Sequence, residues 1–131
     1  MIPNHGEGDG LRAFVAHTAV SNLILRLFSN NITPAETDTA ATFTESAFTG
    51  YAAITLIGAN WTITEGAPSS AAYARQQFTS SAGAQSASVY GAYMTRTTGG
   101  RLALAERFTG GPFSIVNNGD FVGVTPQITF D

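Results

Sequence analysis

The chain of 131 residues contains no cysteine and no lysine. The absence of cysteine excludes disulfide bonds, thiolate chemistry and zinc sites with cysteine ligands, and it leaves the redox compartment open. Charged residues make up 11% of the sequence, which is less than half of the share of about 25% in ordinary globular domains. Most of the solvated surface must therefore consist of Thr, Ser, Asn and Gln.

All six basic residues are arginines. Arg keeps its charge and its planar hydrogen-bonding fork when it is desolvated, which suits a contact surface. A compositional bias of the source lineage explains the same pattern equally well. The formal net charge is −3, and the chain lacks the concentration of basic side chains that binding to phosphates requires. We therefore expect no nucleic-acid partner.

Long apolar runs are also missing. No run approaches the roughly 18 residues that a membrane span needs, and no basic amphipathic stretch would hold the chain at a membrane surface. Residues 1–10 lack the basic and apolar parts of a secretory signal peptide. We expect synthesis and folding in the cytoplasm, and no membrane partner.

The N-terminal region divides into two parts. Residues 1–10 have Gly at positions 6, 8 and 10 and no large apolar side chain after Ile2, so they are expected to form a flexible arm. Apolar residues then follow at near-helical spacing, with Asp9 available as a cap, which predicts a short helix over about 11–21.

Strand signals dominate the rest of the chain. The run 23–28 is apolar on both faces and predicts a central strand. Residues 33–36 fit either one or two helical turns or a loop. Further strands are predicted at 52–56, 61–64, 73–79, 86–95, 101–108, 113–116 and 121–130.

Turn sequences rich in Gly, Asn and Ser separate these strands. The segments 86–95 and 101–108 form the clearest hairpin, and the turn at 117–120 predicts a second one. Regular strands at this spacing predict an all-β fold over 11–131: one β-sandwich domain, jelly-roll-like, or a barrel, with about eight strands.

No constellation in the sequence predicts catalysis, a cofactor or a metal site. His5 and His17 have no Asp, Glu or Cys at ligand spacing, so structural or exposed roles are expected for both. No nucleophile with a matching base is visible. We therefore expect a protein that is not an enzyme and that has no cofactor.

Two charges and two tyrosines stand out on the predicted strands. Arg26 and Glu106 each share strand parity with apolar residues, so they pair as a buried ion pair if their faces meet. The alternative is that an edge strand carries an inward-pointing charge as protection against aggregation. Tyr90 and Tyr93 are expected on opposite faces of one strand, which leaves one of them for a neighbouring subunit or a ligand.

Five segments resemble a family of small proteins encoded by tailed bacteriophages. They are LRLFSNNITP (25–34), FTGYAAITL (48–56), VYGAY (89–93), AERF (105–108) and VTPQIT (124–129). The resemblance covers most of the chain from about residue 11 onward. These motifs specify strands and turns, and none of them is a chemical signature.

The resemblance implies a virion component, namely a capsid decoration or cement protein that binds the outside of the icosahedral shell, commonly as a trimer. Its partners would be the major capsid protein and further copies of itself. Decoration proteins often lay an extended terminus across capsid subunits, so Ile2, Pro3 and His5 are expected contacts, together with Tyr90 and Tyr93. The alternative is a head-fibre or tail-fibre domain that recognises a host glycan or protein.

Overall fold

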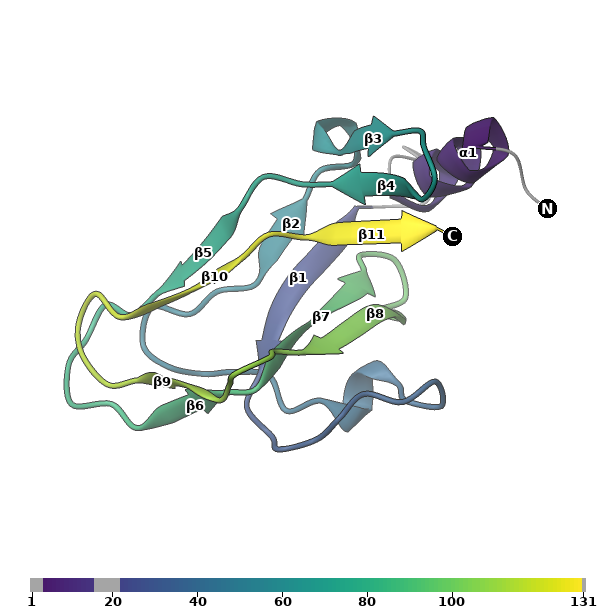
Figure 1. The fold of residues 1–131 in the computed structure, drawn as a ribbon. Coiled ribbons are helices and arrows are strands. Elements are labelled where there is room, and N and C mark those ends of the chain that lie inside the picture. The colour runs from purple at the N-terminus through teal and green to yellow at the C-terminus, as the bar shows by residue number, and fades with distance from the viewer. Residues whose placement is uncertain (1–3, 16–21, 131) are drawn as a thin grey trace.

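The computed structural model describes residues 4–15 and 22–130 (Figure 1). Within these ranges the chain forms one α-helix, α1 (Asn4–Val15), two short 3-10 turns, η1 (Ala40–Thr42) and η2 (Gly58–Asn60), and eleven strands. The strands are β1 (Leu23–Phe28), β2 (Ile54–Leu56), β3 (Thr62–Thr64), β4 (Ser69–Ala72), β5 (Gln76–Thr79), β6 (Ala87–Val89), β7 (Gly91–Arg96), β8 (Leu102–Arg107), β9 (Phe113–Ile115), β10 (Phe121–Val124) and β11 (Gln127–Phe130). All strand pairs are antiparallel, and the predicted all-β fold is confirmed.

The largest sheet has the order β2-β1-β7-β8. β1 is central in it, as its two apolar faces predicted. Its Leu23, Leu25 and Leu27 are completely buried in the main core, and Phe28 is buried in a second cluster on the other face. The predicted hairpin is also present, since β7 pairs with β8 across the turn that precedes Arg101.

The strands β4 to β11, which include β7 and β8 of the large sheet, form one long, nested antiparallel pairing, and β3 pairs with the outer side of β4. β4 pairs with β11, β5 with β10, β6 with β9, and β7 with β8. One register pair from each is Ala72↔Gln127, Phe78↔Val122, Ser88↔Ser114 and Ala92↔Glu106. This nested order, in which the first strand pairs with the last, is the pairing order of the eight strands of a jelly roll.

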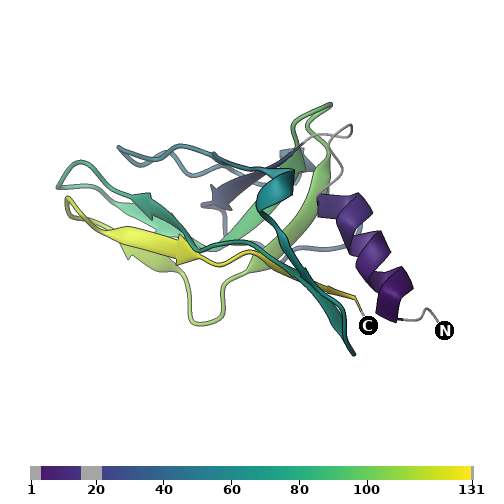
Figure 2. The ribbon, with the colours of Figure 1, turned by 90° about the horizontal axis from the view of Figure 1, so that it is seen from above.

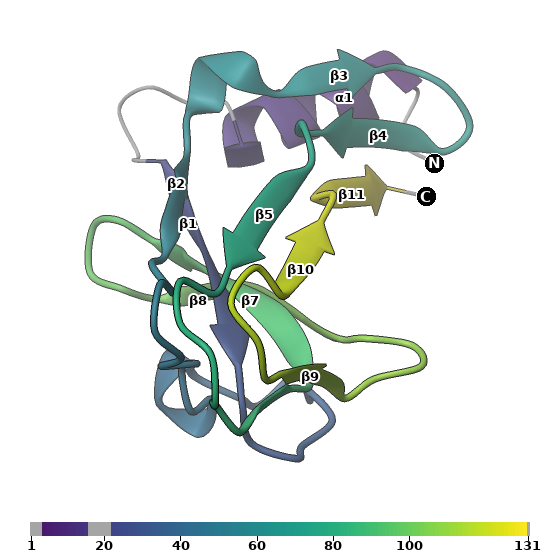
Figure 3. The ribbon, with the colours of Figure 1, turned by 90° about the vertical axis from the view of Figure 1, so that its left-hand side faces the viewer.

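The nested hairpin folds over the large sheet to make two layers. Figure 3 shows β5 and β10 in front of β1, β7 and β8, and side chains of both layers meet in one core that includes Leu25, Phe78 and Val122. Helix α1 lies beside β3, β4 and β11 at the end that holds the C-terminus (Figure 2). Leu11 and Val15 of this helix belong to the same core.

The N-terminal prediction requires a correction. The helix begins at Asn4 rather than near residue 11, so residues 4–10 form helical turns and not the flexible arm that their glycines suggested. Gly10 lies against the ring of Phe130, where a Cβ would be 3.2 Å from the nearest ring atom. Packing against the C-terminal strand thus outweighs the low helix propensity of glycine. The predicted helical segment 16–21, which includes His17, lies outside the described residues.

Two details of the strand prediction also differ. The tract Ser69–Ala72 was not predicted as a strand, because its small side chains have low β propensity. It forms β4, which packs beside α1 and buries Ala71 in the core. The segment 121–130 is divided at Pro126 into β10 and β11. Residues 33–36 form a loop, which is one of the two alternatives that the sequence predicted.

The turn at 117–120 does not close a hairpin. It is well formed, since the Asp120 carboxylate accepts hydrogen bonds from the N–H groups of Val116 and Asn117 at 2.9 and 2.8 Å. The flanking strands β9 and β10 pair with β6 and β5, however, and not with each other. The residues of the turn predicted that the chain reverses direction at 117–120, but they could not predict which strands pair with β9 and β10.

Candidate interaction surface

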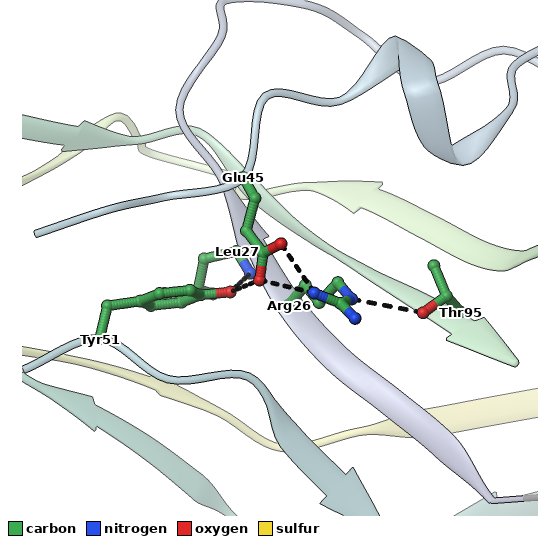
Figure 4. A network of polar contacts seen from close by, with 5 residues as sticks. All are labelled: Arg26, Leu27, Glu45, Tyr51 and Thr95. Carbon is green, nitrogen blue, oxygen red and sulfur yellow. Dashed lines mark hydrogen bonds and ion pairs between the residues drawn. The ribbon is translucent and has the colours of Figure 1, made fainter. Parts of the chain in front are cut away.

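Arg26 is part of a polar network at the border of the large sheet (Figure 4). Its Nη1 donates to both carboxylate oxygens of Glu45, at 2.8 and 2.7 Å, and its Nε donates to Thr95 Oγ1 at 3.3 Å. The hydroxyl of Tyr51 donates to Glu45 Oε1 at 2.8 Å and accepts the N–H of Leu27 at 3.2 Å. All these polar groups therefore have hydrogen-bond partners within the fold.

The network fills a gap in the strand ladder. β2 pairs with β1 only as far as Leu25, and the next bridge on that side joins Phe28 to Glu45. Between these points the buried Leu27 N–H has no strand partner, and the Tyr51 hydroxyl replaces it. Burial raises the pKa of Tyr51, and the neighbouring carboxylate of Glu45 raises it further. The network therefore holds the sheet border together.

The predicted ion pair between Arg26 and Glu106 is wrong, and the register gives the reason. Arg26 is in register with Tyr93, while Glu106 is in register with Ala92. Adjacent residues of a strand point to opposite faces, so the two charges lie on opposite faces of the sheet. Glu106 instead fits the alternative, because it is exposed on β8, an edge strand.

The two tyrosines differ from their prediction as well. The strand is interrupted at Tyr90, and both tyrosines pack in the second cluster with Phe28 and Phe43. Tyr93 is 4% exposed and its ring is stacked on Phe43, and burial raises the pKa of its phenol. Tyr93 is therefore not available as a contact with another molecule. Tyr90 is half-buried beneath the guanidinium of Arg107.

Gly91, the residue after the interruption, packs very closely against its neighbours. A Cβ there would be 2.2 Å from the Glu106 carbonyl oxygen and 2.4 Å from the Phe28 ring. Only glycine allows this approach. Tyr90 and Tyr93, on either side of this glycine, both pack in the second cluster.

Of the arginines, five make specific contacts within the described residues. Besides Arg26, Arg12 pairs with Glu65, Arg75 lies over the ring of Phe121, Arg96 lies over Phe14 and donates to its carbonyl oxygen, and Arg107 donates to Ile32 O and Asn31 Oδ1. The contacts of Arg12, Arg96 and Arg107 join segments that no strand ladder connects. The arginines act as internal clamps, a use that the sequence alone did not reveal.

Exposed large apolar side chains come mostly from one segment of the chain. Among the described residues five large hydrophobic side chains are exposed, and four of them belong to the segment 113–130: Phe113, Val116, Phe121 and Phe130. Phe121 is the most exposed, at 51%. We name this segment, which comprises β9, β10 and β11, the C-terminal limb.

An open groove of about 410 Å³ adjoins this limb. Its floor consists of inner-face residues of the large sheet: Leu25, Ala92, Met94, Leu104 and Glu106. The opposite wall comes from the junction of β10 and β11, with Val124, Thr125, Pro126 and Gln127. The interior of the sandwich thus opens to solvent between the edge strand β8 and the C-terminal limb.

A second, shallower hollow has a different character. It has a volume of about 630 Å³ and lies between the segments 44–48 and 85–90. Hydroxyl and amide side chains dominate its lining, together with one acid and one tyrosine: Ser29, Thr44, Glu45, Ser46, Gln85, Ser86, Ser88 and Tyr90. The buried Ser46 Oγ has no hydrogen-bond partner within residues 4–15 and 22–130.

Three expected contact residues lie at the N-terminus. Ile2 and Pro3 are outside the described residues, and His5 lies in the first half of α1. Among the residues that the structure describes, no group of three His, Cys, Asp or Glu side chains could hold a metal ion. No helix in the described ranges is long and apolar enough to cross a membrane.

Comparisons with known proteins find no matching family model, no matching curated protein and no matching solved structure. The function of this chain is therefore inferred from the shape and chemistry of its surface.

Proposed function

We propose that this chain is a structural protein of a tailed-bacteriophage virion, which is made in the host cytoplasm and decorates the outer surface of the capsid. In this role it binds the major capsid protein as a homotrimer and stabilises the shell. The observation that carries the proposal is the C-terminal limb, which supplies four of the five exposed large apolar side chains of the described residues, on a chain with few charges. Large apolar side chains left exposed in this way suit contacts with other proteins.

The energetics of such a role favour weak individual contacts. A closed trimer that meets three equivalent capsid sites binds the second and third sites at high effective concentration. Each subunit then needs only a modest interface. The internal arginine clamps suit this role, because they leave a firm module whose surface loses little conformational freedom on binding.

Virions that carry the chain allow a direct test. We expect hundreds of copies per particle by quantitative mass spectrometry, and particles that release DNA at a lower temperature when the chain is removed. Phe121→Ser should reduce occupancy of the shell. The substitution also removes the contact with Arg75, so the free energy of unfolding should fall by no more than about 1 kcal/mol. Ile57→Ser is the matched control, since Ile57 is exposed to 43% but lies outside the limb. Equal occupancy of both variants would contradict the role of the limb.

The second hollow favours another candidate function, a fibre domain that binds a host glycan. Its hydroxyl-rich lining and Tyr90 resemble the mix of polar groups and an aromatic face that fixes a small polar ligand. A fibre domain would be present in few copies, and its removal would abolish adsorption without changing the heat resistance of the particle. Copy number thus separates the two functions.

A further inference from the structure

We infer that the groove between β8 and the C-terminal limb binds an extended segment of the capsid protein, which carries alternating apolar side chains and one Lys or Arg that faces Glu106. The segment would add a strand to the free edge of β8. This inference rests on the proposed function and names the site and the chemistry of its partner.

The first step of the argument is the free edge. β8 is the last strand in the order β2-β1-β7-β8, so its six residues pair on one side only within the described chain. In an antiparallel pair about half of the main-chain N–H and C=O groups of an edge strand point away from the partner. These groups form a template for an added strand, and β8 contains no proline that would block it.

The second step is the shape beside that edge. Side chains of an added strand alternate between the two faces of the sheet, so every second one would enter the groove. There it would meet Leu104, Met94 and Val124. Leu104 and Val124 pack only partly buried against the main core, and an apolar side chain in the groove would complete their burial.

The third step is the charge in the groove. Glu106 is the one charged residue that lines it, is exposed, and makes no hydrogen bond or ion pair with any described residue. A second copy of β8 offers no cation to this acid, because Arg107 is the neighbour of Glu106 in the strand and points to the opposite face. An inward-pointing acid on an edge strand therefore opposes pairing between two copies of β8, while it favours a foreign strand with a cationic side chain. Charge complementarity thus favours a foreign strand over a second copy, and the proposed function identifies the capsid protein as its source.

The test uses the full chain and empty shells assembled from the major capsid protein of the same phage. Binding is measured by co-sedimentation, and hydrogen exchange is followed by mass spectrometry over Leu102–Arg107. We expect slower exchange of β8 in the bound state. Glu106→Lys should weaken binding by about tenfold or more, since reversing the charge places like charges together, and Glu106→Gln should have a smaller effect. Glu36→Lys is the matched control, because Glu36 is an exposed acid in the loop 29–39, outside the groove.

Four outcomes decide between the two proposals. Slower exchange of β8 on shells with a specific loss in Glu106→Lys supports the inference. Binding without a change in β8 exchange, or equal losses in Glu106→Lys and Glu36→Lys, overturns the inference and leaves the decoration role intact. Absence of any binding to shells overturns both. Slower exchange that develops with chain concentration alone assigns the groove to a second copy and overturns the choice of partner.

Discussion

Tyr51→Phe removes one oxygen atom and tests whether the polar network holds the border of the large sheet. The substitution leaves the ring stacked on Phe78 and takes away the hydrogen-bond partner that the Leu27 N–H has among the described residues. Leu27 is fully buried, so its N–H remains unsatisfied, which costs about 1–3 kcal/mol. Glu45 also loses a hydrogen bond, but it is partly exposed and water can replace part of that bond. We expect a total loss of about 2–3 kcal/mol in the free energy of unfolding.

Urea unfolding at pH 7 measures this loss. At an m-value of about 1.5–2 kcal/mol/M, the midpoint should fall by about 1–2 M. Tyr90→Phe is the matched control, because the Tyr90 hydroxyl makes no hydrogen bond within the described chain. The free energy of unfolding of this variant should stay within about 0.5 kcal/mol of wild type. A loss below 0.5 kcal/mol for Tyr51→Phe would refute the role of the hydroxyl.

The pH dependence provides an independent readout of the same group. The folded state raises the pKa of Tyr51 above its ordinary value of about 10. A raised pKa means that the folded state holds the proton more tightly, so its stabilising effect is complete below pH 10 and is lost as the pH rises further. The difference in stability between wild type and Tyr51→Phe should therefore shrink above pH 10. A constant difference up to pH 11 would contradict the raised pKa.

Three further predictions concern single positions. Gly91→Ala should lower the free energy of unfolding by more than about 3 kcal/mol or prevent folding, since its Cβ would be 2.2 Å from a carbonyl oxygen. Gly83→Ala is the control and should be nearly neutral in the same urea assay, because its Cβ would be 3.9 Å from the nearest neighbour. Ser46→Ala should leave stability unchanged or raise it by about 1 kcal/mol, because the buried Ser46 Oγ has no hydrogen-bond partner among the described residues. A loss above about 1 kcal/mol would contradict this prediction. The Asp120 carboxylate has a lowered pKa because it accepts two backbone N–H bonds. Its contribution to stability is therefore present above about pH 4 and is lost below it. Asp120→Ala should speed hydrogen exchange of the Val116 and Asn117 amides at pH 7, and unchanged exchange would contradict the role of these bonds in the turn.

Strand propensity and turn chemistry made much of the fold predictable. The double apolar pattern of 23–28 predicted a central strand, and β1 is central. The hairpin of β7 and β8 followed from two strong strand signals joined by a Gly-rich turn. Both features depend on residues that are close together in the sequence, so the local sequence is enough to predict them.

Long-range pairing is where the sequence predictions failed. The correct partner of Arg26 is Glu45, which lies in a loop with no regular pattern, and no local signal pointed to it. The nearest available signal was Tyr51, an aromatic residue that is half-buried in the structure and whose hydroxyl needs a partner. The surface features that carry the functional proposals, namely the C-terminal limb and the groove, likewise depend on which strands become edges.

The sequence by itself determined that this chain folds as an all-β domain with a sparsely charged, hydroxyl-rich surface and a buried first strand. Composition and periodicity suffice for these properties, because each residue contributes to them independently. Only the tertiary structure decided that β4 to β11 nest as four pairs, that Tyr90 and Tyr93 pack in one cluster, and that Glu106 lies in an open groove. Strand pairing and register decide these features, because a shift of one residue exchanges the two faces of a strand.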